Sequence, residues 1–110
     1  MLGERAVEFS SRHPGFAAHS LHLLGDVATY HDRVYGEVGE ALYTRARVLA
    51  DQLGMRPLVA QCHLGLGRLH ARTNRSRTAR EHVERAISMH REMDMPFWLV
   101  ESEEALKRLL

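Results

Sequence analysis

Residues 61–70, QCHLGLGRLH, carry the side chains on this chain that most resemble a chemical site. Cys62 and His63 are metal-ligand types, and Gly65 and Gly67 are spaced like glycines of a phosphate-binding loop. On a helix, adjacent residues project about 100° apart, and neither Cys62 nor His63 is followed four residues later by another ligand type. A dinucleotide loop would require a preceding strand and a third glycine, and the sequence has neither. We therefore expect no metal site and no nucleotide site here.

The elements that hold this stretch are indicated by an internal repeat. Aligning LGMRPLVAQCHLGLGRL with MDMPFWLVESEEALKRL, so that Met55 pairs with Met95, matches the apolar positions, including Leu66 with Leu106. An upstream copy, AAHSLHLLGDVA, also aligns with the first of these segments and pairs Gly25 with Gly67. Between these copies, GEALYTRARVLADQLG and AREHVERAISMHREMD align with each other and pair Tyr43 with Val83. Two kinds of helix therefore alternate along the chain.

Apolar residues in these segments recur three and four residues apart, which is typical of amphipathic helices and not of strands. Pro57 and Pro96 favour helix starts, Gly54 favours a helix end, and Thr78 with Glu81 is spaced as a capping box, with Ser76 as a competing cap. We predict an all-α single domain over residues 1–110, with repeat units 16–54 and 57–94 and a terminal helix 97–110. The predicted helices are 3–12, 16–31, 37–53, 57–72, 77–93 and 97–109.

The recurring glycine predicts close helix packing. Glycine inside a helix costs about 1 kcal/mol relative to alanine, so its recurrence at 25 and 67 implies a compensating contact with a neighbouring helix. Cys62 aligns with Ser20 and Ser102, which predicts a small buried residue. His19 and His22 share a helix face without a third ligand and are interpreted as surface side chains. Gly65 has no interpretation from the sequence.

Composition excludes several classes of protein. The chain has 110 residues, of which 45% are hydrophobic and 26% charged, and its net charge is +1. These values favour one folded domain without a global attraction to nucleic acid or membrane. The chain has a single cysteine, no signal-peptide pattern and no apolar run long enough to span a bilayer. We therefore expect a cytoplasmic protein.

The alternating helices resemble tetratricopeptide (TPR) repeats. The matching residues are Leu24-Gly25 and Leu66-Gly67 in the first helices, and Gly39, Tyr43, Ala46, Ala79, Val83 and Ala86 in the second. Leu21 and His63 replace the usual Trp, Ala28 and His70 replace the usual Tyr, and the period is longer than in TPR proteins. The resemblance implies antiparallel helical hairpins in a short right-handed superhelix; a related hairpin repeat with another pitch is the alternative.

Over residues 4–110 the amino-acid sequence is also similar to the repeats at the carboxy end of large bacterial ATP-binding regulators, including those with nucleotide-cyclase or helix-turn-helix domains. This resemblance implies a non-catalytic module for protein association. No His-Glu-x-x-His, Gly-x-Ser-x-Gly or paired-carboxylate motif is present, so we expect no enzymatic activity and no cofactor.

Three surfaces are candidate interaction sites. The resemblance assigns a protein or peptide partner to a concave face of the first helices, comprising His19, His22, Asp26, Thr29, Tyr30, Gln61, Leu64, Arg68, Arg72, Glu101, Glu104 and Arg108. Apolar residues around the last helix predict self-association: Met93, Met95, Phe97, Trp98, Leu106 and Leu110. The alternative function is nucleic-acid binding by the arginine-rich segment 68–80, through Arg68, Arg72, Arg75, Arg77 and Arg80.

Overall fold

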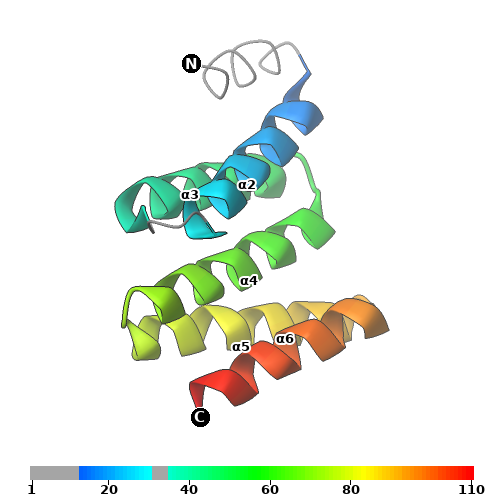
Figure 1. The fold of residues 1–110 in the computed structure, drawn as a ribbon. Helices are drawn as coiled ribbons and strands as arrows, with labels where there is room; N and C mark the ends of the chain where they lie inside the picture. Colours follow the sequence, from blue (N-terminus) through cyan, green and yellow to red (C-terminus); the bar gives the residue numbers. More distant parts are fainter. Residues whose placement is uncertain (1–12, 31–34) are drawn as a thin grey trace.

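The computed structural model describes residues 13–30 and 35–110 (Figure 1). This part of the chain consists of five α-helices and contains no strand. The all-α prediction is confirmed, and the five predicted helices from residue 16 onward agree closely with the observed ones at each described end. The predicted helix 3–12 lies outside the described residues. The helices are α2 (Pro14–Tyr30), α3 (Gly36–Gln52), α4 (Arg56–Arg72), α5 (Ser76–Glu92) and α6 (Pro96–Leu109).

The three turns that join α3 to α6 have the same backbone geometry. Gly54, Asn74 and Asp94 adopt left-handed backbone conformations, with φ of 69°, 61° and 54°. In each turn the next residue donates its N–H to a carbonyl five residues earlier, as in a Schellman cap. The four helices α3 to α6 therefore begin at equal intervals, at Gly36, Arg56, Ser76 and Pro96. The three hydrogen bonds are Met55 to Ala50 (2.8 Å), Arg75 to His70 (2.8 Å) and Met95 to His90 (2.9 Å).

Helix starts follow the prediction only in part. Pro57 lies in the first turn of α4 and Pro96 is the first residue of α6, as expected. The predicted capping box of Thr78 and Glu81 is wrong, because α5 begins at Ser76, with Arg75 at the N-cap position and no side-chain cap. The tight turn through Asn74 brings the chain into helical geometry two residues before Thr78.

The helices are arranged in two layers (Figure 1). The first helices, α2, α4 and α6, contact one another in that order, whereas the backbones of the second helices, α3 and α5, do not approach each other closely. Each second helix packs against the first helix before it and the one after it. The described chain is thus a stack of helical hairpins, with α2 at one end and α6 at the other.

Glycines allow the hairpins to pack closely. A β-carbon on Gly67 would collide with Val83 of α5, and one on Gly25 would lie 2.8 Å from the Tyr43 ring of α3. These are the same contact in two successive hairpins, so the predicted packing role of the recurring glycine is confirmed. Cys62 is completely buried, as predicted.

Gly65, which the repeat pattern left unexplained, also contacts the Tyr43 ring. A β-carbon there would lie 2.5 Å from Tyr43 Cε1. In the next hairpin Tyr43 is replaced by Val83 and Gly65 by Ala105, and these two smaller partners share one core cluster. The size of the second-helix side chain therefore decides whether the following first helix can carry alanine or must carry glycine.

Candidate partner-binding site

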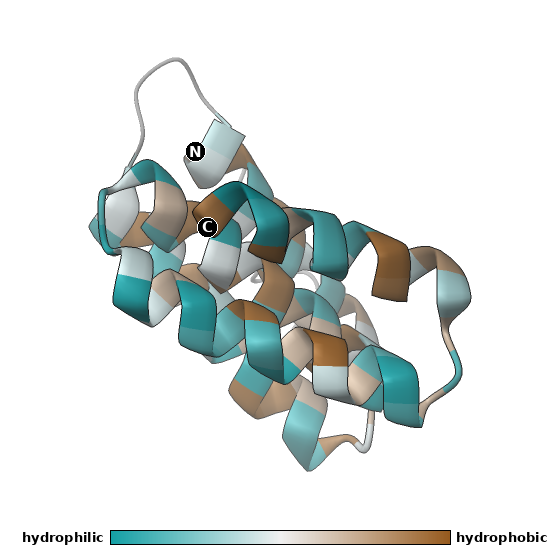
Figure 2. Ribbon diagram, turned by 90° about the horizontal axis from the view of Figure 1, so that it is seen from below, coloured by the Kyte–Doolittle hydropathy of each residue, from teal (hydrophilic) through white to brown (hydrophobic). Residues whose placement is uncertain are grey.

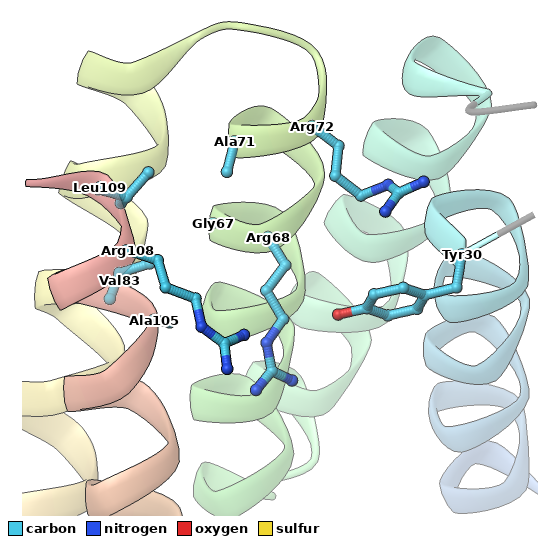
Figure 3. A pocket seen from close by; sticks show the side chains of 9 residues that line it. All are labelled: Tyr30, Gly67, Arg68, Ala71, Arg72, Val83, Ala105, Arg108 and Leu109. Carbon is cyan, nitrogen blue, oxygen red and sulfur yellow. The ribbon is translucent and has the colours of Figure 1, made fainter.

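A pocket of about 220 Å³ opens on the face formed by the first helices (Figure 3). Its rim carries Tyr30 from α2, Arg68 and Arg72 from α4, and Arg108 from α6. We call it the arginine pocket. Small residues on α4 and α6 leave this space open, because no long side chain fills the gap between the two helices. The floor consists of Gly67, Ala71, Val83, Ala105 and Leu109.

The three guanidinium groups of the rim have different surroundings. Arg68 Nη2 lies 3.3 Å from Glu101 Oε2, which links α4 to α6. The Arg72 guanidinium carbon lies 5.9 Å from the centre of the Tyr30 ring, a cation–π contact that links α4 to α2. Arg108 is exposed and forms no ion pair with any carboxylate in the described part of the chain. The pocket therefore holds more positive than negative charge.

The structure brings together some residues of the predicted binding face and separates others. Tyr30, Arg68, Arg72 and Arg108 line the arginine pocket, and Glu101 lies beside it. Other members of the predicted face do not line it. His19 is exposed, Gln61 is half-buried, and Glu104 forms a 3.3 Å ion pair with Lys107.

Two members of the predicted face are wrong because they are buried. Leu64 is 1% exposed and packs in a core cluster with Val83 of α5. Thr29 is completely buried, donates its hydroxyl to the Gly25 carbonyl at 2.9 Å, and lies 3.2 Å from the Tyr43 hydroxyl. Neither side chain is accessible to a partner, since the first helices pack against the second helices through these positions.

Asp26 and His22, also predicted for the binding face, belong to a polar network inside the first hairpin. The Tyr43 hydroxyl donates to Asp26 Oδ1 at 2.5 Å, and His22 Nδ1 lies 3.6 Å from Asp26 Oδ2. Burial, followed by the bond to Asp26, raises the pKa of Tyr43 above its usual value. The hydrogen bond to Asp26 gives the hydroxyl of the buried Tyr43 side chain a partner.

The residues predicted for self-association fall into two groups. Phe97 and Leu110 are exposed, at 66% and 81% of their surface, and Val100, which the sequence did not single out, is 58% exposed. Figure 2 views the end of the stack where α6 lies and shows apolar positions toward both ends of that helix. The remaining predicted residues are partly buried, and three of them pack against the core of their own chain: Met93, Trp98 and Leu106. Met95 is half-buried.

The arginine-rich segment 68–80 does not form one basic patch. Arg68 and Arg72 line the arginine pocket, where Arg72 is turned toward Tyr30 (Figure 3), and the other three arginines lie next to carboxylates. Such exposed pairs contribute little stability, but each carboxylate offsets the local positive charge. The three pairs are Arg75 with Glu40 at 3.8 Å, Arg77 with Glu81 at 3.9 Å, and Arg80 with Glu84 at 2.8 Å.

Three histidines that the sequence analysis did not group form a stack between α4 and α5. His63 Nδ1 lies 3.1 Å from His82 Nδ1, and the rings of His82 and His70 are nearly parallel with centres 5.7 Å apart. His63 and His70 are two turns apart on α4, a spacing that places them on one helix face. In residues 13–30 and 35–110, no group of three or more His, Cys, Asp or Glu side chains is arranged to hold a metal ion.

The histidine stack is electrically neutral near pH 7. Burial and the neighbouring His82, Arg47 and Arg85 lower the pKa of His63 to about 4. Burial also lowers the pKa values of His70 and His82. The short contact between His63 and His82 is therefore an N–H···N hydrogen bond between neutral rings.

The chain matches no known protein-family model, and no curated protein or solved structure shows significant similarity to it. Among the described helices, none combines the length and apolar character needed to cross a bilayer.

Proposed function

We propose that this protein is a non-catalytic helical-repeat module that binds a protein or peptide partner at the arginine pocket. The observation that carries the proposal is the pocket itself, which combines an apolar floor with a polar and cationic rim on adjacent helices. Binding sites typically have this composition, because apolar area supplies affinity and a few placed polar groups supply orientation. The rim residues come from three helices of the stack, so a partner that occupies the pocket would contact successive repeats.

The wider parts of the proposal rest on the sequence resemblance. We propose that the hairpins follow a right-handed superhelix of TPR type, and that the module belongs to or derives from a bacterial signalling or transcription regulator. The equal spacing of helix starts and the glycine contact repeated in two hairpins support a true repeat protein. In such proteins the first helices form the inner, ligand-facing surface.

A steric block of the pocket tests the proposed function. Ala71 is an exposed residue of the pocket floor, so Ala71→Trp fills the space without changing charge or core packing. The matched control is Ala41→Trp, which places the same side chain on the exposed surface of α3. Peptides selected from a random display library on the native protein should bind the control normally and lose at least about tenfold in affinity for Ala71→Trp, which corresponds to about 1.4 kcal/mol. Equal binding to both variants would show that the pocket is not the binding site.

Nucleic-acid binding remains the competing proposal, but the geometry gives it less support. Continuous binding to a phosphate backbone uses several unpaired cations along one surface. Here Arg75, Arg77 and Arg80 each lie beside a carboxylate. Retention on heparin at moderate salt, abolished by replacing two of these three arginines, would favour nucleic acid over a protein partner.

A further inference from the structure

We infer that the arginine pocket recognises the carboxylate of a Glu or Asp side chain in an extended acidic segment of a partner protein, with an adjacent apolar side chain covering the pocket floor. The inference rests on the proposed function and adds the chemistry of the partner. It follows from the charge of the rim, the size of the pocket and the one carboxylate already present beside it.

The charge of the rim favours an anion. Arg68, Arg72 and Arg108 all line the pocket, and Glu101 is the one carboxylate of the described chain that pairs with any of them. A guanidinium presents paired N–H donors that match the two oxygens of a carboxylate. Arg72 and Arg108 line the same pocket and pair with no carboxylate among the described residues, so both have donors left for an anionic ligand.

The size and floor of the pocket favour side chains over a bulky ligand. Its volume of about 220 Å³ lies below the roughly 300–1,000 Å³ of pockets that enclose drug-sized molecules. The floor residues are glycine, alanine, valine and leucine, which offer no side-chain hydrogen bond. An acidic side chain with an apolar neighbour two residues away matches a cationic rim above an apolar floor. Residues two apart lie on the same side of an extended segment, so the acid can reach the rim while the apolar side chain covers the floor.

A carboxylate is favoured over the phosphates of a nucleic acid. The positive charge is concentrated at the pocket, whereas Arg75, Arg77 and Arg80 lie next to acidic groups and the net charge of the chain is only +1. A nucleic acid would require further cations along its path. A single carboxylate requires only the arginines of the pocket.

Glu101 supplies an internal model of the proposed contact. Its carboxylate lies 3.3 Å from Arg68, so it occupies one of the three rim guanidinium groups and repels an incoming acid. Removing its charge should therefore strengthen binding, whereas removing the charge of Arg72 or Arg108 should weaken it. A site that recognises only apolar side chains would respond to neither change.

The test uses a fluorescent peptide in which Leu-Glu-Glu occurs three times, and a counterpart with Gln in place of every Glu. Binding is measured by fluorescence anisotropy at low salt to the native protein, Arg72→Gln/Arg108→Gln, Glu101→Gln and Ala71→Trp. The control is Arg77→Gln, because Arg77 is highly exposed, lies outside the pocket and pairs with its own helix neighbour Glu81. Circular dichroism confirms that each variant is folded.

We expect the Glu peptide to bind at least about tenfold more tightly than the Gln peptide, as expected for charge-assisted hydrogen bonds. The double arginine variant should lose at least about tenfold, Glu101→Gln should gain about threefold, and Arg77→Gln should stay within about twofold of the native protein. Equal affinity for the two peptides, or no binding of the Glu peptide up to about 1 mM, would overturn the inference.

The proposed function and the inference fail in different ways. If both peptides bind equally and Ala71→Trp weakens both, the pocket binds partners without recognising a carboxylate, and only the inference is lost. If display-selected peptides bind Ala71→Trp as tightly as the native protein, the proposed function is wrong as well. Tighter binding of a short single-stranded DNA than of the Glu peptide, abolished by Arg72→Gln/Arg108→Gln, would assign the pocket to phosphate and overturn the inference.

Discussion

The ring of Tyr43 lies between Gly25 of α2 and Gly65 of α4, so close to Gly65 that a β-carbon there would lie 2.5 Å from the ring. The side chain is completely buried at the centre of the stack. Because Tyr43 belongs to a second helix and its two glycine neighbours to successive first helices, its ring limits how closely both α2 and α4 can pack against α3.

Replacing Gly65 with alanine should destabilise the protein by up to about 2 kcal/mol, because overpacking costs about 1–3 kcal/mol and the gain in helix propensity offsets only about 1 kcal/mol. Urea unfolding measures the difference. Gly15→Ala is the matched control, since Gly15 also lies in a helix but a β-carbon there would have no neighbour within 4 Å. The control should leave stability unchanged or raise it by up to about 1 kcal/mol.

The clash can be isolated with a double-mutant cycle. Val83 and Ala105 already occupy the positions of Tyr43 and Gly65 in the next hairpin. Combining Gly65→Ala with Tyr43→Val should therefore cost at least about 1 kcal/mol less than the sum of the two single changes. Additive costs would contradict the proposed dependence of the glycine on the tyrosine ring.

The left-handed turn residues predict that adding a glycine at one turn stabilises the protein, whereas removing a glycine from another turn destabilises it. Asp94 has φ of 54° at the position that Gly54 occupies in an earlier turn of the stack with φ of 69°. A left-handed conformation costs a non-glycine residue about 1 kcal/mol, so Asp94→Gly should stabilise the protein by about 0.5–1 kcal/mol, and Gly54→Ala should destabilise it by about 1 kcal/mol. Thermal unfolding of both variants measures these effects, and a loss of stability in Asp94→Gly would contradict the shared turn geometry.

The histidine stack predicts acid sensitivity. The pKa of His63 is lowered to about 4 in the folded protein, and those of His70 and His82 are also lowered, against about 6.5 in the unfolded chain. The unfolded chain therefore binds more protons between about pH 6.5 and about pH 4, and stability should fall as the pH decreases through this window. Above this window the stack should contribute no pH dependence.

Urea midpoints at pH 7, 6 and 5 measure this effect. His63→Gln keeps a polar group at the contact with His82 but removes the ring whose pKa is lowered to about 4, so the fall in the midpoint should become shallower. His19→Gln changes an exposed histidine outside the stack and is the matched control. A native protein whose midpoint stays constant from pH 7 to 5 would contradict the buried, neutral state of the three rings.

Cys62 should be chemically inert in the folded protein. Its side chain is completely buried, and burial raises the pKa of the thiol to about 12. Because the thiolate is the reactive species, an aromatic disulfide reagent at pH 8 should react with Cys62 only through unfolding. The rate should rise steeply with urea, in parallel with the unfolded fraction. Rapid stoichiometric reaction in native buffer would contradict the burial.

Self-association through α6 is open to a direct measurement. Phe97, Val100 and Leu110 expose apolar surface on this helix and its end, and covering such surface favours assembly. We expect light scattering to show a mass that rises with protein concentration, and Phe97→Ser/Val100→Ser to reduce that rise. Leu53→Ser, which alters an exposed apolar residue on the turn after α3, is the control. A monomer over a wide concentration range would contradict the predicted self-association.

The sequence alone determined the helices and their alternation, because amphipathic periodicity and repeated Leu-Gly pairs are local patterns. Pro57, Pro96 and Gly54 marked helix ends correctly, since each restricts its own backbone wherever it occurs. The recurrence of Gly25 and Gly67 also predicted a close contact, without identifying the side chains that make it.

Only the tertiary structure decided which side chains meet. Leu64 and Thr29 were assigned to a binding face by repeat position, but both are buried, because accessibility depends on the rotation of each helix against its neighbours. The arginine pocket joins Tyr30 of α2 to Arg108 of α6, which are far apart in the sequence, and the histidine stack joins α4 to α5. Periodicity places a residue on one face of its own helix, whereas these sites depend on how faces of different helices come together in space.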